Sequence, residues 1–556
     1  MNKYLRVMIF CILCSAVFLA GQELEFAEPA ADELGMTAHP LNPDEGVMIL
    51  LRKVTFNDSR ADAYKEEYLR IKIFNEKGMN RATIEIPYFE QLPVIALKAR
   101  TISKEGKITV VPKEKINDIN IIKKKKFRMK AKSFTFPNVE PGCIVEYIYQ
   151  VQRYPQALVE LEVQDTIFTK KADFTIKSNK FLPMGVMSFN MTLAVQHTQE
   201  GNNVKVAVQD IPGFVQEAFS PPDEESKMRI VFFYTGKRYS SSDEFWKDYG
   251  KTIQNFSEEF MKKNKKLKEA ITPLLQKATT PEEKIKALYE YVQGYKNLTY
   301  SSATGPKEIK TVDDLVKCKC GKEHELNMLF AAALRLAGLD SYVALSANRM
   351  NAKFNKDFAN PDQLSDVIAA IKDGSGYRYF SPGTWGSSMK ALSWYLYNMP
   401  VLVLTAEPIF STMPTFDPAT SISTEEDQLI IKEDGIRQIK KKITLSDVAS
   451  ADWRLTFMDA EDDQIKPEYD KILKAIEPGI IIDSFSVQNR EDFKQPIIIE
   501  TEYHYSEALP LDKLALPIPS TYSFEDRMFT TPTRKHPLCH EINGRKIYRI
   551  EVTAPS

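Results

Sequence analysis

Cysteine and histidine are the side chains of this sequence that could carry out nucleophilic catalysis, and six of each occur among its 556 residues. Cys318, Cys320 and His324 fall in the short stretch KCKCGKEH. A catalytic cysteine acts as its thiolate, and it needs a base that takes and returns the proton. Because only one residue separates Cys318 from Cys320, a disulfide between them is predicted to be strained and disfavoured. No cysteine pair has zinc-ribbon spacing, so no metal site is predicted.

Helical periodicity surrounds this stretch. Thr280, Pro281 and Glu283 form an N-cap, a first-turn proline and a capping-box acid, which predict a helix that begins at Pro281. A second helix is predicted to begin near Lys322 and to stop at Gly338. Strand-like runs follow at 342–346, 367–371 and 377–380, the last two joined by a hairpin through 373–376.

The region before the helices, from about residue 45 to 235, has the pattern of strands. Leu69, Ile71 and Ile73 alternate with Arg70 and Lys72, and turn residues separate many short runs of this kind. This pattern predicts a β-sandwich. The basic run 123–126 is expected to be a solvated hairpin, with an anionic partner as the alternative.

The region after the helices begins with a stretch rich in Pro, Ser and Thr, residues 412–428, which indicates a domain joint. Alternation then returns in Trp453, Leu455 and Phe457 and in residues 497–499. A second β-sandwich is therefore predicted for the C-terminal part.

The first residues have the pattern of a secretory signal peptide. Lys3 and Arg6 precede the apolar run 7–20, and the small residues Ala20 and Gly21 suit a signal peptidase. No later segment reaches the length of apolar sequence that a membrane span requires. We therefore expect export to the periplasm or cell envelope and a mature chain without a transmembrane span. The formal net charge of -1 gives no general attraction to nucleic acid, and no nucleic-acid partner is predicted.

Several motifs resemble exported bacterial proteins of the transglutaminase-like superfamily that carry an N-terminal β domain of unknown function. The first part contains YLRIKIFNEKG, ATIEIPY and FTFPNVEPGCIVEYIY, and the middle contains EKIKALYEYVQ, CGKEHELNMLFAAALRLAGL and YRYFSPGT. The resemblance implies an α+β multidomain fold, with a β-sandwich on each side of a papain-like core. The expected divisions are a signal peptide (1–21), an N-terminal β-sandwich domain (22–238), a helical lead-in and core (239–410), and a C-terminal β domain (411–556).

The same resemblance identifies the positions of a Cys-His-Asp triad. In the family pattern the cysteine opens the helix that ends in LRxxG, the histidine opens a strand, and the aspartate orients the histidine. Counted without a gap, the cysteine position holds Glu323, the histidine position holds Asp366 and the aspartate position holds Ser381. All three roles are vacant, and Glu323 in the first turn of a helix is favourable without any catalytic role.

Three alternatives stay open for this region. Cys320 is the fallback nucleophile, although it lies three residues before the family position and would need a histidine from elsewhere in the fold. Glu323 and Asp366 could instead form an acid/base or metal-binding pair. Trp385 and Trp394 could stack on a peptide or a sugar, or they could be part of the core.

The leading hypothesis is an exported, non-catalytic binding or scaffold protein of the cell envelope. It would bind a peptide, protein or glycan in the cleft of the core, without a cofactor. The first alternative is an active cysteine peptidase or protein-glutamine acyl-transferase that uses Cys320, and the second is a purely structural envelope protein. A fold by itself does not decide among these functions.

Overall fold

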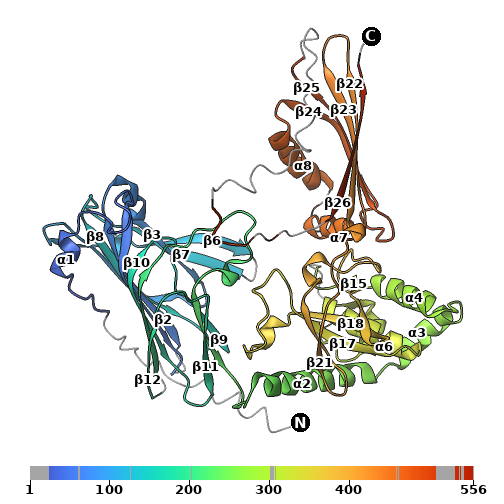
Figure 1. Cartoon of the computed structure of the whole chain (residues 1–556), viewed down its shortest axis with the longest axis horizontal. Helices are drawn as coiled ribbons and strands as arrows, with labels where there is room; N and C mark the ends of the chain where they lie inside the picture. Colours follow the sequence, from blue (N-terminus) through green and yellow to red (C-terminus); the bar gives the residue numbers. More distant parts are fainter. Residues whose placement is uncertain are drawn as a thin grey trace. The chain divides into compact units, whose positions relative to one another are not determined.

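The structure is a computed structural model that describes residues 24–59, 63–124, 127–201, 203–300, 306, 308–458, 460, 462–508, 533–537, 539 and 544–554. The expected signal peptide, residues 1–21, lies outside this part of the chain. The chain divides into two compact units: residues 1–216 with 226–238 form unit 1, and residues 217–225 with 239–556 form unit 2. Unit 1 consists mainly of strands, and unit 2 contains the long helices (Figure 1). The finer division into four parts stays a prediction.

An eight-stranded sheet forms the centre of unit 1, in the order β12-β13-β10-β1-β2-β8-β4-β5. The predicted alternation is present in β2, where Leu69, Ile71 and Ile73 all contribute to one apolar core. β1 and β10 are parallel, and the other neighbours are antiparallel. The strands of this sheet are β1 (Val47–Asn57), β2 (Tyr64–Ile73), β4 (Val94–Ile102), β5 (Ile108–Val110), β8 (Ile144–Gln152), β10 (Thr169–Lys177), β12 (Gln196–Glu200) and β13 (Asn203–Ile211).

Two three-stranded sheets, β3-β7-β6 and β11-β14-β9, complete the predicted N-terminal β domain. Ile86 and Phe134 of the first small sheet pack into the core beneath β2. Leu161 and Phe232 of the second pack into a core shared with β10 and β13. Lys123 and Lys124 of the basic run end β6, and residues 125 and 126 lie outside the described part of the chain. These strands are β3 (Thr83–Phe89), β6 (Asn117–Lys124), β7 (Phe127–Thr135), β9 (Leu158–Glu162), β11 (Met184–Phe189) and β14 (Arg229–Tyr234), and the short helix α1 (Ala31–Gly35) precedes them all.

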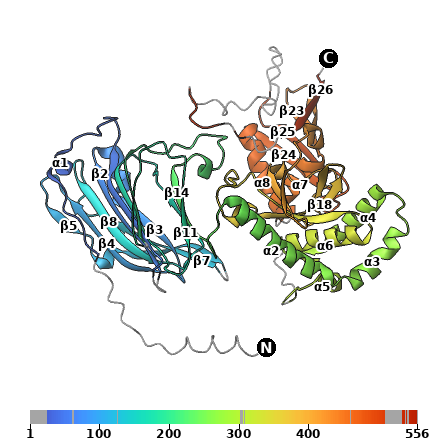
Figure 2. The same ribbon diagram turned by 60° about the horizontal axis from the view of Figure 1, so that its bottom comes forward.

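Unit 2 begins with the helices and the five-stranded sheet of the predicted core (Figure 2). The capping box is confirmed, because the Thr280 hydroxyl accepts from the Glu283 amide at 3.2 Å and the Glu283 carboxylate accepts from the Thr280 amide at 3.1 Å. The sheet order is β19-β18-β17-β20-β21. Its strands are β17 (Ser341–Ser346), β18 (Asp366–Asp373), β19 (Gly376–Phe380), β20 (Pro400–Val403) and β21 (Ile409–Thr412).

The helix α6 (Glu323–Leu336) crosses the middle of this core and packs against β17 and β18. Leu326, Leu329 and Leu334 are buried, as the periodicity predicts. No helix of the described ranges is long and apolar enough to cross a membrane. The other elements here are α2 (Ser242–Lys262), α3 (Lys265–Leu275), α4 (Pro281–Gln293), α5 (Val312–Cys318) and the paired short strands β15 (Lys296–Asn297) and β16 (Cys320–Gly321).

The C-terminal part differs from the predicted second sandwich. Its described residues form one five-stranded sheet, β24-β25-β23-β22-β26, with helix α8 against one face. The strand predicted around Trp453 and Leu455 is wrong, because both residues lie in helix α7, where Val448 and Ala451 fill the buried face. The elements are β22 (Ile422–Ile431), β23 (Arg437–Leu445), α7 (Asp447–Thr456), α8 (Asp462–Ile476), β24 (Ile480–Gln488), β25 (Ile497–Tyr505) and β26 (Arg545–Thr553).

Candidate functional site

The start of α6 is fixed by hydrogen bonds from both sides of the chain. The Glu325 carboxylate accepts from the Lys322 amide at 2.7 Å, and the Glu323 amide donates to the Thr299 hydroxyl at 2.8 Å. These contacts satisfy amide groups that the first turn of a helix leaves without an internal partner. Glu323 is therefore held in the first turn, at the position that the family resemblance assigns to the nucleophile.

The Glu323 carboxylate is half-buried and accepts hydrogen bonds from two hydroxyl groups. Tyr300 donates to Oε2 at 2.5 Å, and Thr384 donates to Oε1 at 2.7 Å. Burial raises the pKa of Glu323, and the charge of Asp366 raises it further, while the two hydroxyl groups act in the opposite direction. The carboxylates of Glu323 and Asp366 thus interact electrostatically, as an acid/base or metal-binding pair would require.

Asp366, which the family resemblance assigns to the histidine position, opens β18. Its Oδ2 accepts from the Ser365 hydroxyl at 2.7 Å and from the Asn348 amide group at 3.1 Å. Burial raises the pKa of Asp366, and these two neutral donors only partly offset that effect. Like Glu323, this carboxylate is half-buried.

Ser381, which the family resemblance assigns to the aspartate position, is buried and joined to Glu323 through Thr384. The Ser381 and Thr384 hydroxyl oxygens are 2.6 Å apart. Since the single Thr384 proton points to Glu323, Ser381 donates to Thr384. The structure therefore connects Ser381 with Glu323 by one directed chain of hydrogen bonds.

Asn327 is a residue of this network that sequence reasoning missed. Its side chain is fully buried on α6 and donates to the Ser381 hydroxyl at 3.0 Å and to the Val367 carbonyl at 2.8 Å. Its carbonyl oxygen accepts from the Gly383 amide at 2.8 Å. The sequence does contain a signal for this residue: Asn327 is a single amide side chain within the apolar stripe of α6, and a buried polar group needs hydrogen-bond partners.

Two tyrosines complete the surroundings of the acidic pair. Burial raises the pKa of Tyr300, and the nearby charges of Glu323 and Asp366 add to the shift. The pKa of Tyr395 is raised for the same reasons. Both phenols therefore stay protonated at neutral pH, where a phenol can donate a hydrogen bond to a carboxylate.

Cys320 is not a free thiol in this structure. It forms a disulfide with Cys318, and its side chain is 7% exposed. The prediction that a disulfide between Cys318 and Cys320 is disfavoured is therefore wrong. The left-handed backbone at Lys319 (φ 52°) turns the chain so that the two sulfur atoms meet. Among the described residues the free cysteines are Cys143, which is buried, and Cys539.

The other residues singled out from the sequence lie in separate settings. His324 is exposed on α6, and His504 pairs with Asp483 at 3.0 Å in the C-terminal sheet. Trp385 is half-buried against Phe493, with ring centres 5.3 Å apart. Trp394 is half-buried beside Tyr395, at 5.9 Å. Within the described ranges, no group of three His, Cys, Asp or Glu side chains could hold a metal ion.

The comparisons with known proteins give two family matches. Residues 61–213 match a domain of unknown function, DUF3857, and residues 268–375 match the core of the transglutaminase-like superfamily. No curated protein matches the sequence.

Three solved structures illustrate the structural similarity. A candidate protease from Parabacteroides distasonis is 13% identical, with 83% of this chain and 94% of that chain covered and a TM-score of 0.44. A candidate cysteine protease from Cytophaga hutchinsonii is 7% identical, with 41% and 71% covered and a TM-score of 0.15. An M1 zinc metallopeptidase from Deinococcus radiodurans is 6% identical, with 36% and 45% covered and a TM-score of 0.18. These scores are too low to carry an argument. The family matches do carry one: the chain contains a DUF3857 segment followed by a transglutaminase-like core.

Proposed function

We propose that this chain is a non-catalytic binding protein of the cell envelope, and that its core binds a cationic group of a peptide, protein or glycan beside Glu323 and Asp366. The single observation that carries this proposal is the hydrogen-bond network at the triad positions. Glutamate, aspartate and serine replace cysteine, histidine and aspartate, and Thr384 links two of them.

The residues assigned to this site include neither the cysteine nucleophile nor the histidine base that cysteine catalysis requires. The nucleophile position holds a carboxylate, the base position holds a second carboxylate, and Cys320 is bonded to Cys318. A thiolate with a histidine partner is what acyl transfer of this type uses. The same site does have groups suited to binding, since protein carboxylates form strong charge-assisted hydrogen bonds with cations.

The chemistry of the two carboxylates favours a cation as the ligand group. The side chains that donate hydrogen bonds to them are neutral: Tyr300 and Thr384 for Glu323, Ser365 and Asn348 for Asp366. Burial raises the pKa of both carboxyl groups, and none of the hydrogen-bond donors found for them among the described residues is charged. A protonated amine between them would supply the missing charge. Stacking by Trp385 and Trp394 stays a prediction within this proposal.

A binding experiment tests the proposal directly. Isothermal titration of the folded chain with a short lysine oligopeptide at neutral pH should show saturable binding. The double variant Glu323→Gln and Asp366→Asn should weaken it by about tenfold or more, which corresponds to about 1.4 kcal/mol. The matched control Asp373→Asn alters an exposed carboxylate on the same strand, and we expect no loss. Equal affinity of all three proteins would reject the acidic pair as a binding site.

A catalytic assay tests the second part of the proposal, that the chain is non-catalytic. The chain, before and after reduction, should neither hydrolyse peptides nor incorporate an amine into a glutamine substrate. Turnover that appears on reduction and disappears on alkylation of Cys320 would instead establish the cysteine enzyme.

A further inference from the structure

The face of the large sheet in unit 1 that carries Arg70 and Lys72 is buried although its side chains are polar. Tyr68 and Arg70 of β2 are 3% and 2% exposed, Lys72 of the same strand is 0% exposed, and Arg100 of β4 is 8% exposed. Glu146 of β8, also 0% exposed, lies directly opposite both arginines in the strand register. We call these five residues the cradle.

Glu146 holds the cradle together from the middle strand. Its Oε1 accepts from Arg100 at 2.9 Å, and its Oε2 accepts from the Tyr68 hydroxyl at 2.6 Å and from Arg70 at 3.3 Å. One carboxylate therefore serves two guanidinium groups, and Lys72 adds a third positive charge. Buried charges without enough counter-charge are costly, so the cradle calls for an acidic or carbonyl-rich partner.

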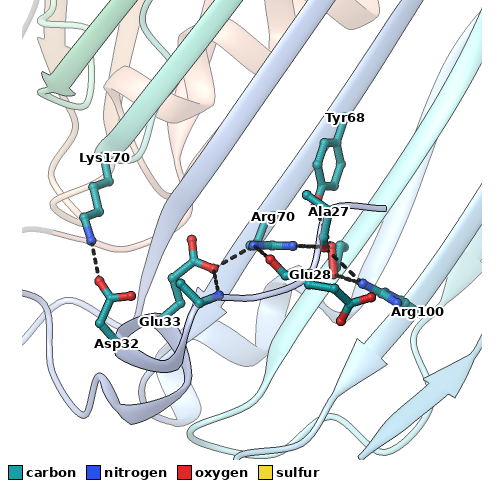
Figure 3. Close-up of polar contacts among 10 residues, drawn as sticks. Ala27, Glu28, Asp32, Glu33, Tyr68, Arg70, Arg100 and Lys170 are labelled. Carbon is teal, nitrogen blue, oxygen red and sulfur yellow. Dashed lines mark hydrogen bonds and ion pairs between the residues drawn. The ribbon is translucent and has the colours of Figure 1, made fainter. Parts of the chain in front are cut away.

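The chain's own N-terminal segment, residues 24–36, supplies that partner (Figure 3). Arg70 donates to the carbonyl oxygens of Ala27 and Glu28 and, at 2.6 Å, to the Glu33 carboxylate. Arg100 also reaches the Ala27 carbonyl, at 3.3 Å. Figure 3 shows the Arg70 side chain between the backbone of the segment and Glu33.

Further contacts extend along the segment. Lys72 donates to the Leu34 carbonyl at 3.0 Å, and Lys98 of β4 donates to the Leu24 carbonyl at 2.9 Å. The recognition therefore uses main-chain carbonyl groups at both ends of the segment. It does not depend on a continuous strand ladder, because residues 24–30 form no strand with the sheet.

Apolar anchors flank these polar contacts. Leu24 is buried against Tyr68 and Ile148, and the ring of Phe26 lies beneath the Arg100 guanidinium at 4.5 Å. At the other end, Leu34 and Met36 pack against a second apolar group on the same face. The segment has acidic residues at 25, 28, 32 and 33 and no basic residue, so its charge is complementary to that of the cradle.

We infer that the cradle is a peptide-binding site for an acidic segment with an apolar residue at each end, and that residues 24–36 are its resident ligand. A buried ion pair is not by itself strongly stabilising, but it makes binding selective, because a segment of the wrong charge leaves the arginines unpaired. A partner segment of the same chemistry can then replace the resident one. This site lies in unit 1 and is independent of the acidic pair in the core.

The test uses the chain from residue 22 to 556 with a protease site inserted between Pro43 and Asp44, in an exposed turn. The protein folds intact and is cut afterwards, so that folding does not depend on the variant. A fluorescein-labelled peptide of residues 22–36 is then added in excess, and its fluorescence anisotropy is followed to equilibrium. We expect saturable binding with release of the cut fragment.

Peptide variants make the test specific without any change to the protein. Glu33→Ala and Phe26→Ala peptides should each bind about tenfold more weakly, since they lose the contacts to Arg70 and Arg100. Asp32→Ala is the matched control, because Asp32 is exposed and its contact to Lys170 is long, at 3.4 Å; its affinity should stay within about twofold. Equal affinity of all peptides, or a cut fragment that never exchanges, would overturn the inference.

Discussion

Glu323, which the family resemblance places at the cysteine position, shows how one carboxylate is held at the start of a helix. The carboxylate occupies the first turn of α6, where the helix dipole favours a negative charge, and it accepts hydrogen bonds from Tyr300 and Thr384 in two loops. Its place in the fold is therefore well defined, and the substitution of a thiol at this position stays a prediction.

The pH dependence of stability should reveal this carboxylate. Burial raises the pKa of Glu323, so the folded state binds its proton more tightly than the unfolded chain does. The stabilising contribution is complete below the usual carboxyl pKa and is lost as the pH rises through the raised value. We expect Glu323→Gln to gain stability relative to the natural protein as the pH increases across that window. Urea unfolding at a series of pH values measures this. The expectation would be contradicted if the stability difference between Glu323→Gln and the natural protein did not change with pH, as is expected for the exposed control Glu259→Gln.

The state of Cys320 can be measured independently. In the folded, oxidised protein, iodoacetamide should leave Cys318 and Cys320 unlabelled, because both sulfur atoms are in the disulfide. After reduction, Cys320 should be labelled more slowly than in the unfolded chain, since its side chain is buried. Peptide mapping by mass spectrometry reads both results. Rapid labelling of native Cys320 without a reductant would show that the disulfide is absent.

The helix α6 is the element that organises the core, and Asn327 is its principal polar contact. Periodicity predicted the bounds and the apolar stripe of this helix, because leucine spacing fixes which side faces the core. Periodicity could not predict the partners of Asn327, which come from Val367, Ser381 and Gly383 far along the chain. Similarly, alternation around Trp453 suggested a strand, but packing of Val448 and Ala451 favours helix α7.

Removal of Asn327 should destabilise the core strongly. Asn327→Ala leaves the buried Gly383 amide and Val367 carbonyl without these partners, at a cost of about 1 to 3 kcal/mol for each buried polar group left unsatisfied. Urea unfolding followed by tryptophan fluorescence measures the loss. Asn351→Ala, at an exposed position, is the control and should change stability by about 0.5 kcal/mol or less. A similar small effect for Asn327→Ala would mean that water replaces its contacts.

The whole chain consists of two compact units with separate apolar cores. The cradle belongs to unit 1, and the acidic pair belongs to unit 2. Units with their own cores can unfold as separate transitions.

Calorimetry can test this independence. We expect two unfolding transitions. Asn327→Ala should lower the midpoint temperature of one transition and Glu146→Gln that of the other, because each variant disrupts one unit only. Glu146→Gln removes the buried negative charge between Arg70 and Arg100. If both variants shifted the same transition, the two units would have to unfold together.

The sequence by itself determined many of the helices and strands, and it predicted that the triad positions are substituted. Capping residues, leucine spacing and alternating strands act locally, so the helix after Thr280, the helix α6 and the strand β2 followed from the printed residues. The assignment of Glu323 to the cysteine position comes from the family resemblance and stays a prediction. The tertiary structure decided which distant groups meet. It brought Thr384 between Ser381 and Glu323, it turned Cys318 toward Cys320, and it placed residues 24–36 over Arg70 and Arg100. These contacts depend on packing between segments far apart in the chain, and no local pattern of side chains specifies that packing.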